Sequence, residues 1–427
     1  MEFELDDDLI AVEDLASQVF GALATVERVV EVERTEGGFD ATLWKALADS
    51  GLLGLALPES AGGADMGMLG LTTILQQQGR RVAPVPVWSV VAGAALPLAR
   101  FGTPEQIERY VPGIVDGSIV LTGAFDGNPG ESAALTAIRK GDDLVISGEI
   151  PSVPWAPGAA GVVVPVLCDE SVAVVVASAD APGLTVTPVS VTGQTADAAL
   201  RFDDVVVAAA DVLPGDGTQI AEWTRRRIRL AIAALQLGVC EESLRMTAAY
   251  TSERMQFGRP LSTNQAVAVR AADAYIDTEA IRLTMRRAAW LIDTGREDEA
   301  DAAVLVAKWW AARGGIRVGL TAQHLHGGIG ADIDYPIHRY FLWGRQLAFT
   351  LGGADASAAA LGDILDRAPG PRPPPEHPPP PPAPPAAAAV LLDTRRAHAR
   401  RGRATIARVM TTSASQIACG GATPGGG

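Results

Sequence analysis

Between Gln219 and Leu325 the chain keeps the apolar spacing of amphipathic α-helices almost without interruption. The spacing predicts three helical segments, at about 219–254, 266–292 and 298–325. Each of them is about 25 residues or longer, and helices of that length bury their apolar faces by packing side by side. The sequence therefore predicts a helical bundle in its C-terminal half.

The segment before this bundle is of a different kind. From about Val120 onward, short β-rich runs alternate with Gly, Asp and Pro turn residues: LVISGEI, GVVVPVL, VAVVVAS, GLTVTPV and AALRFDDVVV. Between Asp6 and about Gly117 the pattern is helical again. We therefore expect an α+β fold with an N-terminal helical domain over residues 1–118, a middle β-domain over 119–218 and a four-helix bundle over 219–367.

Residues 368–427 differ from all three predicted domains. Proline fills 12 of the 17 positions from Pro369 to Pro385, and several arginines and a Gly-rich end follow. Such a composition favours an extended chain without a core. We expect a disordered tail, with an anion-binding or partner-docking arm as the alternative.

Composition narrows the class of protein. The chain has 427 residues, 48% of them apolar, and a formal net charge of −15, which makes nucleic acid an unexpected partner for the body. Its acidic start, MEFELDDDLI, lacks the charge pattern of a secretory signal, and the apolar stretch 83–99 is interrupted by prolines and too short to span a membrane. Only three cysteines are present, widely spaced. A cytoplasmic protein without disulfides is expected.

Two clusters in the bundle attract attention. Arg254, Gln256 and Phe257 follow the first long helix and offer a cation, an amide and an aromatic ring, a set that suits a phosphate-bearing cofactor. The alternative is an ordinary helix end with a favourable arginine and a buried phenylalanine. Gly327 and Gly328 follow the third helix, where they allow either close approach of a ligand or a simple helix cap.

Together and in this order, the two clusters resemble motifs of the acyl-CoA dehydrogenase family. The first motif is Y-x-x-x-R-x-Q-F-G with a further Gln, and the second is H-G-G-x-G followed by D-Y-P-x-x-R. The matching residues here are Tyr250, Arg254, Gln256, Phe257, Gly258 and Gln265, then His326, Gly327, Gly328, Gly330, Asp334, Tyr335, Pro336 and Arg339. The order of helical, β and bundle domains is also similar to that family over roughly residues 5–367.

The resemblance implies an FAD enzyme that removes an α-proton and a β-hydride from an acyl-CoA. A carboxylate serves as the general base, a polar cradle holds the flavin ring, and the helical domain of the neighbouring subunit holds the nucleotide arm of the FAD. The usual Glu aligns with Gly352, and the alternative Glu position of the family aligns with Ile228. Both base positions therefore lack a carboxylate, whereas Arg229 matches an arginine that the family keeps near the substrate.

The flavin cradle departs from the family pattern as well. Phe125 and Asp126 stand where Thr and Glu are expected, and Ile150, Ser152 and Pro154 stand where Lys, Trp and Thr are expected. By contrast, the residues that act on a neighbour's FAD are present. The resemblance assigns to this nucleotide grip Arg254, Gln256, Phe257, Gln265, His324, Gly327 and Gly328, with His324 in place of a Gln.

This asymmetry predicts the non-catalytic subunit of a heteromeric, α2β2-type acyl-CoA dehydrogenase that shares FAD with a catalytic partner. It is similar to the paired bacterial enzymes that act on CoA thioesters of sterol side chains. One alternative is a self-sufficient homo-oligomer with a displaced base, for which Asp355 and Glu253 are the nearest carboxylates in the sequence. Another is a flavin-free scaffold of the same fold.

Two further patterns have ordinary interpretations. His324 and His326 lie two residues apart on a helix without accompanying carboxylates or cysteines, so no metal site is expected. The run Arg225–Arg229 contains four arginines. It predicts either a solvated helix face or a contact with CoA phosphate or a partner protein.

Overall fold

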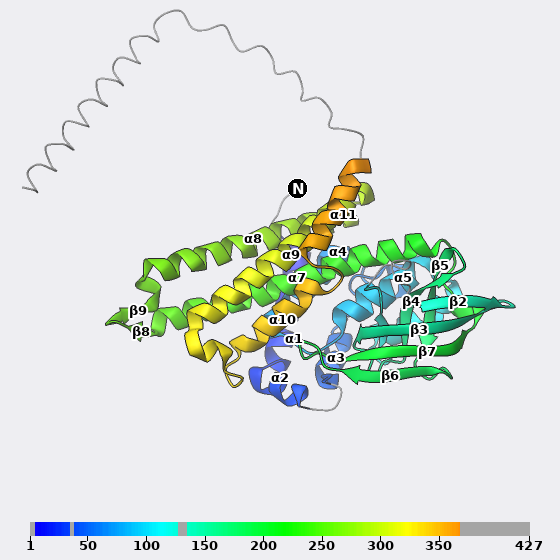
Figure 1. The fold of residues 1–427 in the computed structure, drawn as a ribbon, viewed down its shortest axis with the longest axis horizontal. Helices are drawn as coiled ribbons and strands as arrows, with labels where there is room; N and C mark the ends of the chain where they lie inside the picture. The colour runs from blue at the N-terminus through cyan, green and yellow to red at the C-terminus, as the bar shows by residue number, and fades with distance from the viewer. Residues whose placement is uncertain (1–4, 35–37, 127–134, 368–427) are drawn as a thin grey trace, which may run out of the picture. The chain divides into compact units, whose positions relative to one another are not determined.

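The computed structural model describes residues 5–34, 38–126 and 135–367 (Figure 1). The expected tail therefore lies outside the described residues. The described part follows the predicted order of helices, sheet and helical bundle, so the expected fold class is confirmed.

Six α-helices form the N-terminal part of the chain. Three of them begin at side chains that cap backbone N–H groups: Asp6 accepts from Leu9 N at 2.9 Å, Thr25 caps α2 and Asp40 caps α3. The bounds are α1 Asp7–Leu23, α2 Val26–Glu33, α3 Ala41–Asp49, α4 Gly67–Arg81, α5 Leu96–Phe101 and α6 Pro104–Val115.

The apolar stretch 83–99 is buried core, as predicted, and every residue from 83 to 98 is buried. Its backbone forms a π-helix, η2 Trp88–Ala95, that runs directly into α5. Hydropathy indicates burial but not the wider hydrogen-bond spacing of a π-helix, which is rare.

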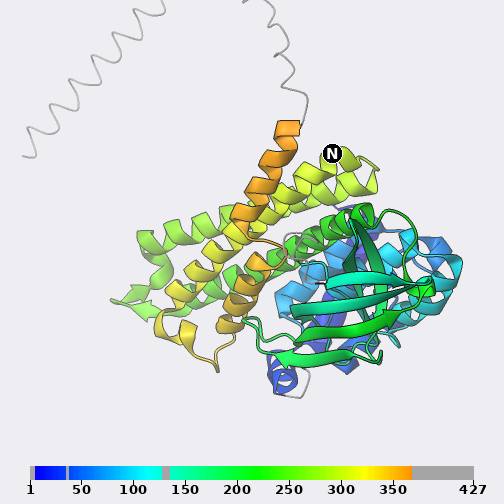
Figure 2. The same ribbon diagram turned by 45° about the vertical axis from the view of Figure 1, so that its right-hand side comes forward.

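A seven-stranded sheet follows, with the order β1-β4-β2-β3-β7-β6 and with β5 paired to β4 (Figure 2). The five predicted runs are all strands: β3 Asp143–Pro154, β4 Gly161–Cys168, β5 Ser171–Ser178, β6 Leu184–Val189 and β7 Asp197–Val207. The sequence did not indicate β1 Leu121–Gly123 or β2 Leu135–Lys140. Both are short, and each runs parallel to β4, a pairing that joins residues distant in the chain.

Long helices make up the C-terminal part, and the three predicted ones are confirmed. The bounds are α7 Gly217–Glu253, α8 Gln265–Asp293, α9 Glu297–His326, α10 Ile337–Phe349 and α11 Ala354–Arg367. α7 has 37 residues and packs against α8, α9 and α10 of the bundle and against α4 of the N-terminal part. The longest helix therefore joins the two helical regions.

The crossing of α4 and α7 brings two backbones into direct contact. A Cβ atom added to Gly79 would lie 2.1 Å from the Leu235 carbonyl oxygen, and one added to Gly238 would lie 2.0 Å from the Gln76 carbonyl oxygen. No side chain fits at either glycine, since real Cβ atoms do not approach other atoms so closely. Burial follows this packing: α4, α7 and the bundle share one apolar core, and the sheet has a second core of its own.

Candidate functional site

The first motif forms a hairpin at the end of α7. β8 Met255–Gln256 pairs with β9 Arg259–Pro260, and Phe257 and Gly258 make the two-residue turn between them. Both turn residues have positive φ, +52° and +76°, as a type I′ hairpin turn requires. Asn or Asp usually occupies the first of these positions, because a residue with a larger side chain costs about 1–2 kcal/mol there.

The phenylalanine in this turn points into solvent. Phe257 is 97% exposed, so the expectation of a buried phenylalanine at an ordinary helix end is wrong. Arg254 and Gln256 are exposed too, and within the described ranges their side chains have no hydrogen-bond or ion-pair partner. Strained, exposed aromatic residues are typical of binding sites rather than of folding cores. Gln265, at the start of α8, is also exposed.

The second motif ends α9 and leaves its backbone accessible. Gly327 has φ +65°, and a Cβ atom added to Gly327 or Gly328 would meet nothing within 4 Å. His324 is exposed, whereas Gln323 donates its side-chain amide to the Gly330 carbonyl at 3.3 Å. A ligand can therefore approach the peptide groups of this turn directly.

Three aromatic rings connect the two motifs. The Tyr250 ring stacks on the His326 ring with 4.6 Å between centroids, and Tyr335 contacts both rings, at 6.5 Å from Tyr250 and 5.4 Å from His326. His326 Nδ1 lies 2.7 Å from the Ala322 carbonyl, and burial lowers the pKa of this imidazole. The sequence matched these rings to the motif letters but gave them no role. The structure shows that they hold the hairpin and the glycine turn together.

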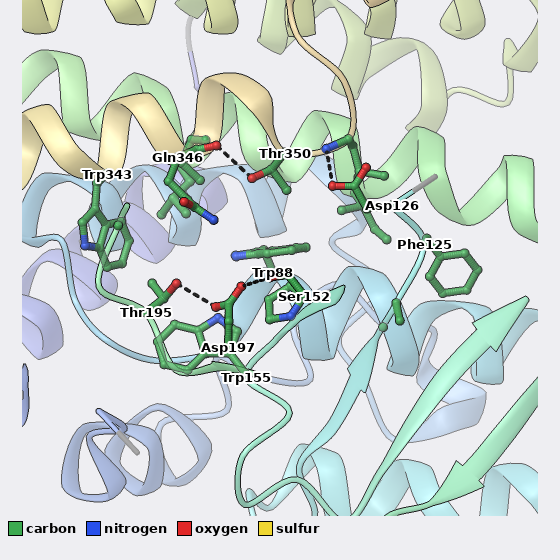
Figure 3. Close-up of a pocket in the computed structure, with 18 of the residues that line it drawn as sticks. Trp88, Phe125, Asp126, Ser152, Trp155, Thr195, Asp197, Trp343, Gln346 and Thr350 are labelled. Atoms are coloured by element: carbon green, nitrogen blue, oxygen red, sulfur yellow. Dashed lines mark hydrogen bonds between the residues drawn. The ribbon is translucent and has the colours of Figure 1, made fainter. Parts of the chain in front are cut away.

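A cavity lies about two thirds of α7 away from this hairpin, between the sheet and α10 (Figure 3). All the positions at which the flavin cradle departs from the family pattern line it, together with one of the two base positions: Phe125, Asp126, Ile150, Ser152, Pro154 and Ile228. The structure thus brings together residues that the sequence could only align one by one.

The polar groups of this cavity bond to one another. Asp197 accepts from Ser152 Oγ at 2.9 Å through one carboxylate oxygen and from Thr195 Oγ1 at 2.8 Å through the other. Asp197 is only 3% exposed, and burial raises the pKa of its carboxyl group. Few polar groups therefore remain free to hold the edge of a flavin ring.

Bulky rings also limit the size of the cavity. Trp88, Trp155 and Trp343 surround it (Figure 3), and its volume is about 90 Å³. Sites that enclose small-molecule ligands usually measure roughly 300–1,000 Å³. The residues present do not fit an isoalloxazine ring here.

A neighbouring cavity of about 230 Å³ contains Arg229 and Gly352, two positions that the sequence singled out. Gly352 has φ +92°, and a Cβ atom there would lie 3.2 Å from the Cβ of Ala356. Burial lowers the pKa of Arg229, whose side chain has no ion pair within the described ranges.

One carboxylate, Asp126, lines both cavities, and the sequence did not indicate it as a candidate base. Its Oδ2 accepts the backbone N–H of Leu351 at 3.2 Å. Asp355 and Glu253, the alternatives from sequence, line neither cavity. Only the fold places Asp126 next to the turn after α10.

A buried lysine lies below that same turn. Lys308, on α9, is 0% exposed and donates its Nζ to the carbonyls of Leu347 and Ala348, at 3.3 and 3.0 Å. These carbonyls belong to the last turn of α10, where helix carbonyls lack helical partners. Burial lowers the pKa of Lys308 to about 7.

The arginine run is not the solvated face that one interpretation expected. Arg225 is 2% exposed and donates Nε to the Phe125 carbonyl at 3.1 Å. Arg226 and Arg227 both form ion pairs with Glu297, the latter at 2.7 Å. Three of the four arginines therefore fasten α7 to neighbouring elements.

Two negative findings concern the described part of the chain. It contains no group of three or more His, Cys, Asp or Glu side chains placed to hold a metal ion. No single helix of it is long and apolar enough to cross a membrane, although the bent pair α1 and α2 meets the length and composition criteria together.

The helical, β and bundle regions, with a nucleotide-type grip on the bundle, define a flavin-linked acyl-CoA dehydrogenase fold. The family model for the N-terminal domain of acyl-CoA dehydrogenases matches residues 14–118, and that for the C-terminal domain matches residues 215–361. The chain belongs to the acyl-CoA dehydrogenase family, whose members are FAD-dependent oxidoreductases acting on CH–CH bonds.

Individual relatives are similar over most of the chain. The acyl-CoA dehydrogenase FadE27 of Mycobacterium tuberculosis is 38% identical over 361 residues, which cover 83% of this chain and 96% of FadE27. The ChsE4-ChsE5 complex from M. tuberculosis contains a chain that is 38% identical, with a TM-score of 0.82 over 87% of this chain and 100% of that one. A chain of the steroid ACAD Tcur3481-Tcur3483 is 44% identical, with a TM-score of 0.79 over 84% of this chain and 98% of that one.

Proposed function

We propose that this chain is the non-catalytic subunit of a heteromeric acyl-CoA dehydrogenase and completes the FAD site of a catalytic partner. The partner supplies the base and the flavin pocket, and this chain supplies the nucleotide grip. Likeness to the steroid ACAD and to the ChsE4-ChsE5 complex supports a homologous partner and a steroid CoA thioester as the substrate class.

The observation that carries the proposal is the contrast between the two ends of α7. At one end, Ile228 and Leu235 line a small cavity whose polar groups are already bonded to one another. At the other end, the hairpin after α7 exposes Arg254, Gln256 and Phe257. From Ile228 to Arg254 the helix rises about 39 Å, so the hairpin cannot fold back onto the chain's own cavity.

Each grip residue has a chemical task. The Arg254 guanidinium suits a pyrophosphate, Gln256 offers both a donor and an acceptor, and the Phe257 ring offers an apolar face to a planar group. Gly327 and Gly328 leave backbone groups open beside them. Bound FAD would supply the hydride acceptor for oxidation of the CH–CH bond.

The proposal predicts that Arg254→Ala lowers FAD retention in the complex with the partner. Removing a charge-assisted contact costs about 1.5–3 kcal/mol, so the affinity for FAD should become about 10- to 150-fold weaker. The measurement is the flavin-to-protein ratio after gel filtration of the co-expressed complex, followed by titration of FAD into the apo-complex.

Arg201→Ala is the matched control. Arg201 is an exposed arginine on β7, remote from the hairpin, and its loss should leave the flavin content unchanged. Equal FAD affinity of the Arg254 variant and the Arg201 variant would contradict the assignment of the grip.

A second prediction concerns the missing base. Gly352→Glu should give no acyl-CoA-dependent dye reduction by the chain alone, because the cavity beside it still excludes a flavin ring. The backbone at φ +92° and the nearby Ala356 Cβ also disfavour a side chain at this position. Measurable turnover by this single variant would show that the β-domain does hold a flavin.

Asp126 favours a second candidate, a self-sufficient dehydrogenase with a displaced base. It is a carboxylate lining both cavities, beside the turn that carries Gly352. Expression of the chain alone distinguishes the two functions: the proposed subunit should purify without flavin, whereas a self-sufficient enzyme should purify yellow and be reduced by an acyl-CoA.

A further inference from the structure

The outer face of α8 carries an apolar stripe that the chain itself does not cover. Val269, Ile276 and Leu283 are 52%, 61% and 43% exposed, and they recur every seven residues. Such a spacing keeps the three side chains on one side of the helix, as in the seam of a coiled coil. Tyr275, 57% exposed, widens the stripe beside Ile276.

The opposite face of α8 is already in use. Ala274, Ile281 and Met285 are buried, and α8 packs against α7, α9 and α4. Along the bundle its outer face stays open in both views of the ribbon (Figures 1 and 2). A regular, exposed apolar stripe of this kind is typical of an interaction surface.

We propose that this stripe, the α8 seam, packs antiparallel against the α8 seam of a second copy of the chain. The seam is symmetric about Ile276: Val269 lies seven residues before it and Leu283 seven residues after it. In an antiparallel pair centred on Ile276, Val269 of one copy meets Leu283 of the other, and the two Ile276 side chains meet on the twofold axis. An isologous interface requires this kind of self-complementarity.

The smaller positions follow the same symmetry. Ala272 and Ala280 lie four residues on either side of Ile276, so each faces the other across the pair and lets the helices approach closely. Glu279, which would lie near Asp273 of the second copy, already has Arg282 of its own chain as counter-charge, at 3.1 Å. The seam is therefore matched in shape, and its main acidic neighbour is neutralised.

This inference stands apart from the flavin role. It predicts that two copies of the chain contact each other directly, whether they occur alone or within an assembly that also contains a catalytic partner. Its test therefore measures contact between identical chains and needs neither FAD nor turnover.

The first experiment is crosslinking through the twofold axis, in a Cys419→Ser background. The other two cysteines, Cys168 and Cys240, are buried. Ile276→Cys should give a covalent dimer with a short bismaleimide, both in the chain alone at micromolar concentration and in any co-purified complex. The control Ile138→Cys, at a 66% exposed position on β2, should stay uncrosslinked. Absence of the Ile276 crosslink from both samples, or equal crosslinking of the control, would overturn the proposal.

The second experiment changes the seam itself. Ile276→Asp places two carboxylates on the axis and should raise the dimer dissociation constant about 100-fold or more, measured by sedimentation equilibrium. Leu283→Asp should act in the same direction, and Ile138→Asp should have no effect. All three positions are solvent-exposed, so circular dichroism and melting temperature should not change. Unaltered self-association of both seam variants would exclude this interface.

Discussion

Gly238→Ala is expected to destabilise the protein by about 3–5 kcal/mol, or to prevent folding altogether. The added methyl group would lie 2.0 Å from the Gln76 carbonyl oxygen and 2.8 Å from the Arg80 backbone nitrogen. Backbone atoms cannot move aside as a flexible side chain would, so α4 and α7 would have to separate. Chemical denaturation followed by circular dichroism measures the loss.

The reciprocal variant and a matched control make this test specific. Gly79→Ala introduces the same conflict from the α4 side, at 2.1 Å from the Leu235 carbonyl oxygen, and should cost a similar amount. Gly362→Ala lies within α11, where an added Cβ meets nothing within 4 Å. It should be neutral or stabilise the protein by up to about 1 kcal/mol, because alanine is the better helix former. A Gly238 variant as stable as the Gly362 variant would mean that the helices do not cross as described.

Lys308→Met should remove much of the pH dependence of stability between pH 7 and pH 10. The pKa of this lysine falls from 10.5 to about 7 on folding. As the pH decreases from 10 to 7, the unfolded chain binds a proton that the folded chain does not, so the free energy of unfolding of the natural protein decreases. One pKa unit corresponds to about 1.4 kcal/mol, which gives about 3 kcal/mol between pH 9.5 and pH 7.

The measurement is urea denaturation of both proteins at pH 7 and at pH 9.5. The stability of the methionine variant relative to the natural protein should rise by about that amount as the pH is lowered. Lys45→Met is the control, since the Lys45 side chain is 63% exposed and pairs with Asp49 at the surface. If Lys308→Met and Lys45→Met responded alike to pH, the buried site would not hold a neutral lysine.

The sequence predicted the parts of the fold that depend on local patterns. Helical spacing located α7, α8 and α9 to within a few residues, because each is long and buries one side throughout. Valine-rich runs between turn residues located five strands for a similar reason. β1 and β2 were missed because three and six residues carry little pattern, and what holds them in place is a parallel partner far along the chain.

The candidate site divides in the same way. Arg254, Gln256 and Phe257 were indicated because they form one short motif, and the structure adds that their surroundings are open to solvent. Asp126 and Lys308 were not indicated, since neither belongs to a motif and each acquires its environment from the turn after α10. Their assignment to FAD or substrate remains a prediction until the variants are measured.

An unbroken α7 restricts how the length of this chain can change. One residue inserted or deleted between Ile228 and Arg254 would rotate everything beyond it by about 100° and shift it by about 1.5 Å. The hairpin would then present its side chains in another direction, although every side chain would still be present. Loops absorb changes in chain length during evolution, and here the bundle helix itself must keep its residue count if the hairpin is to stay oriented.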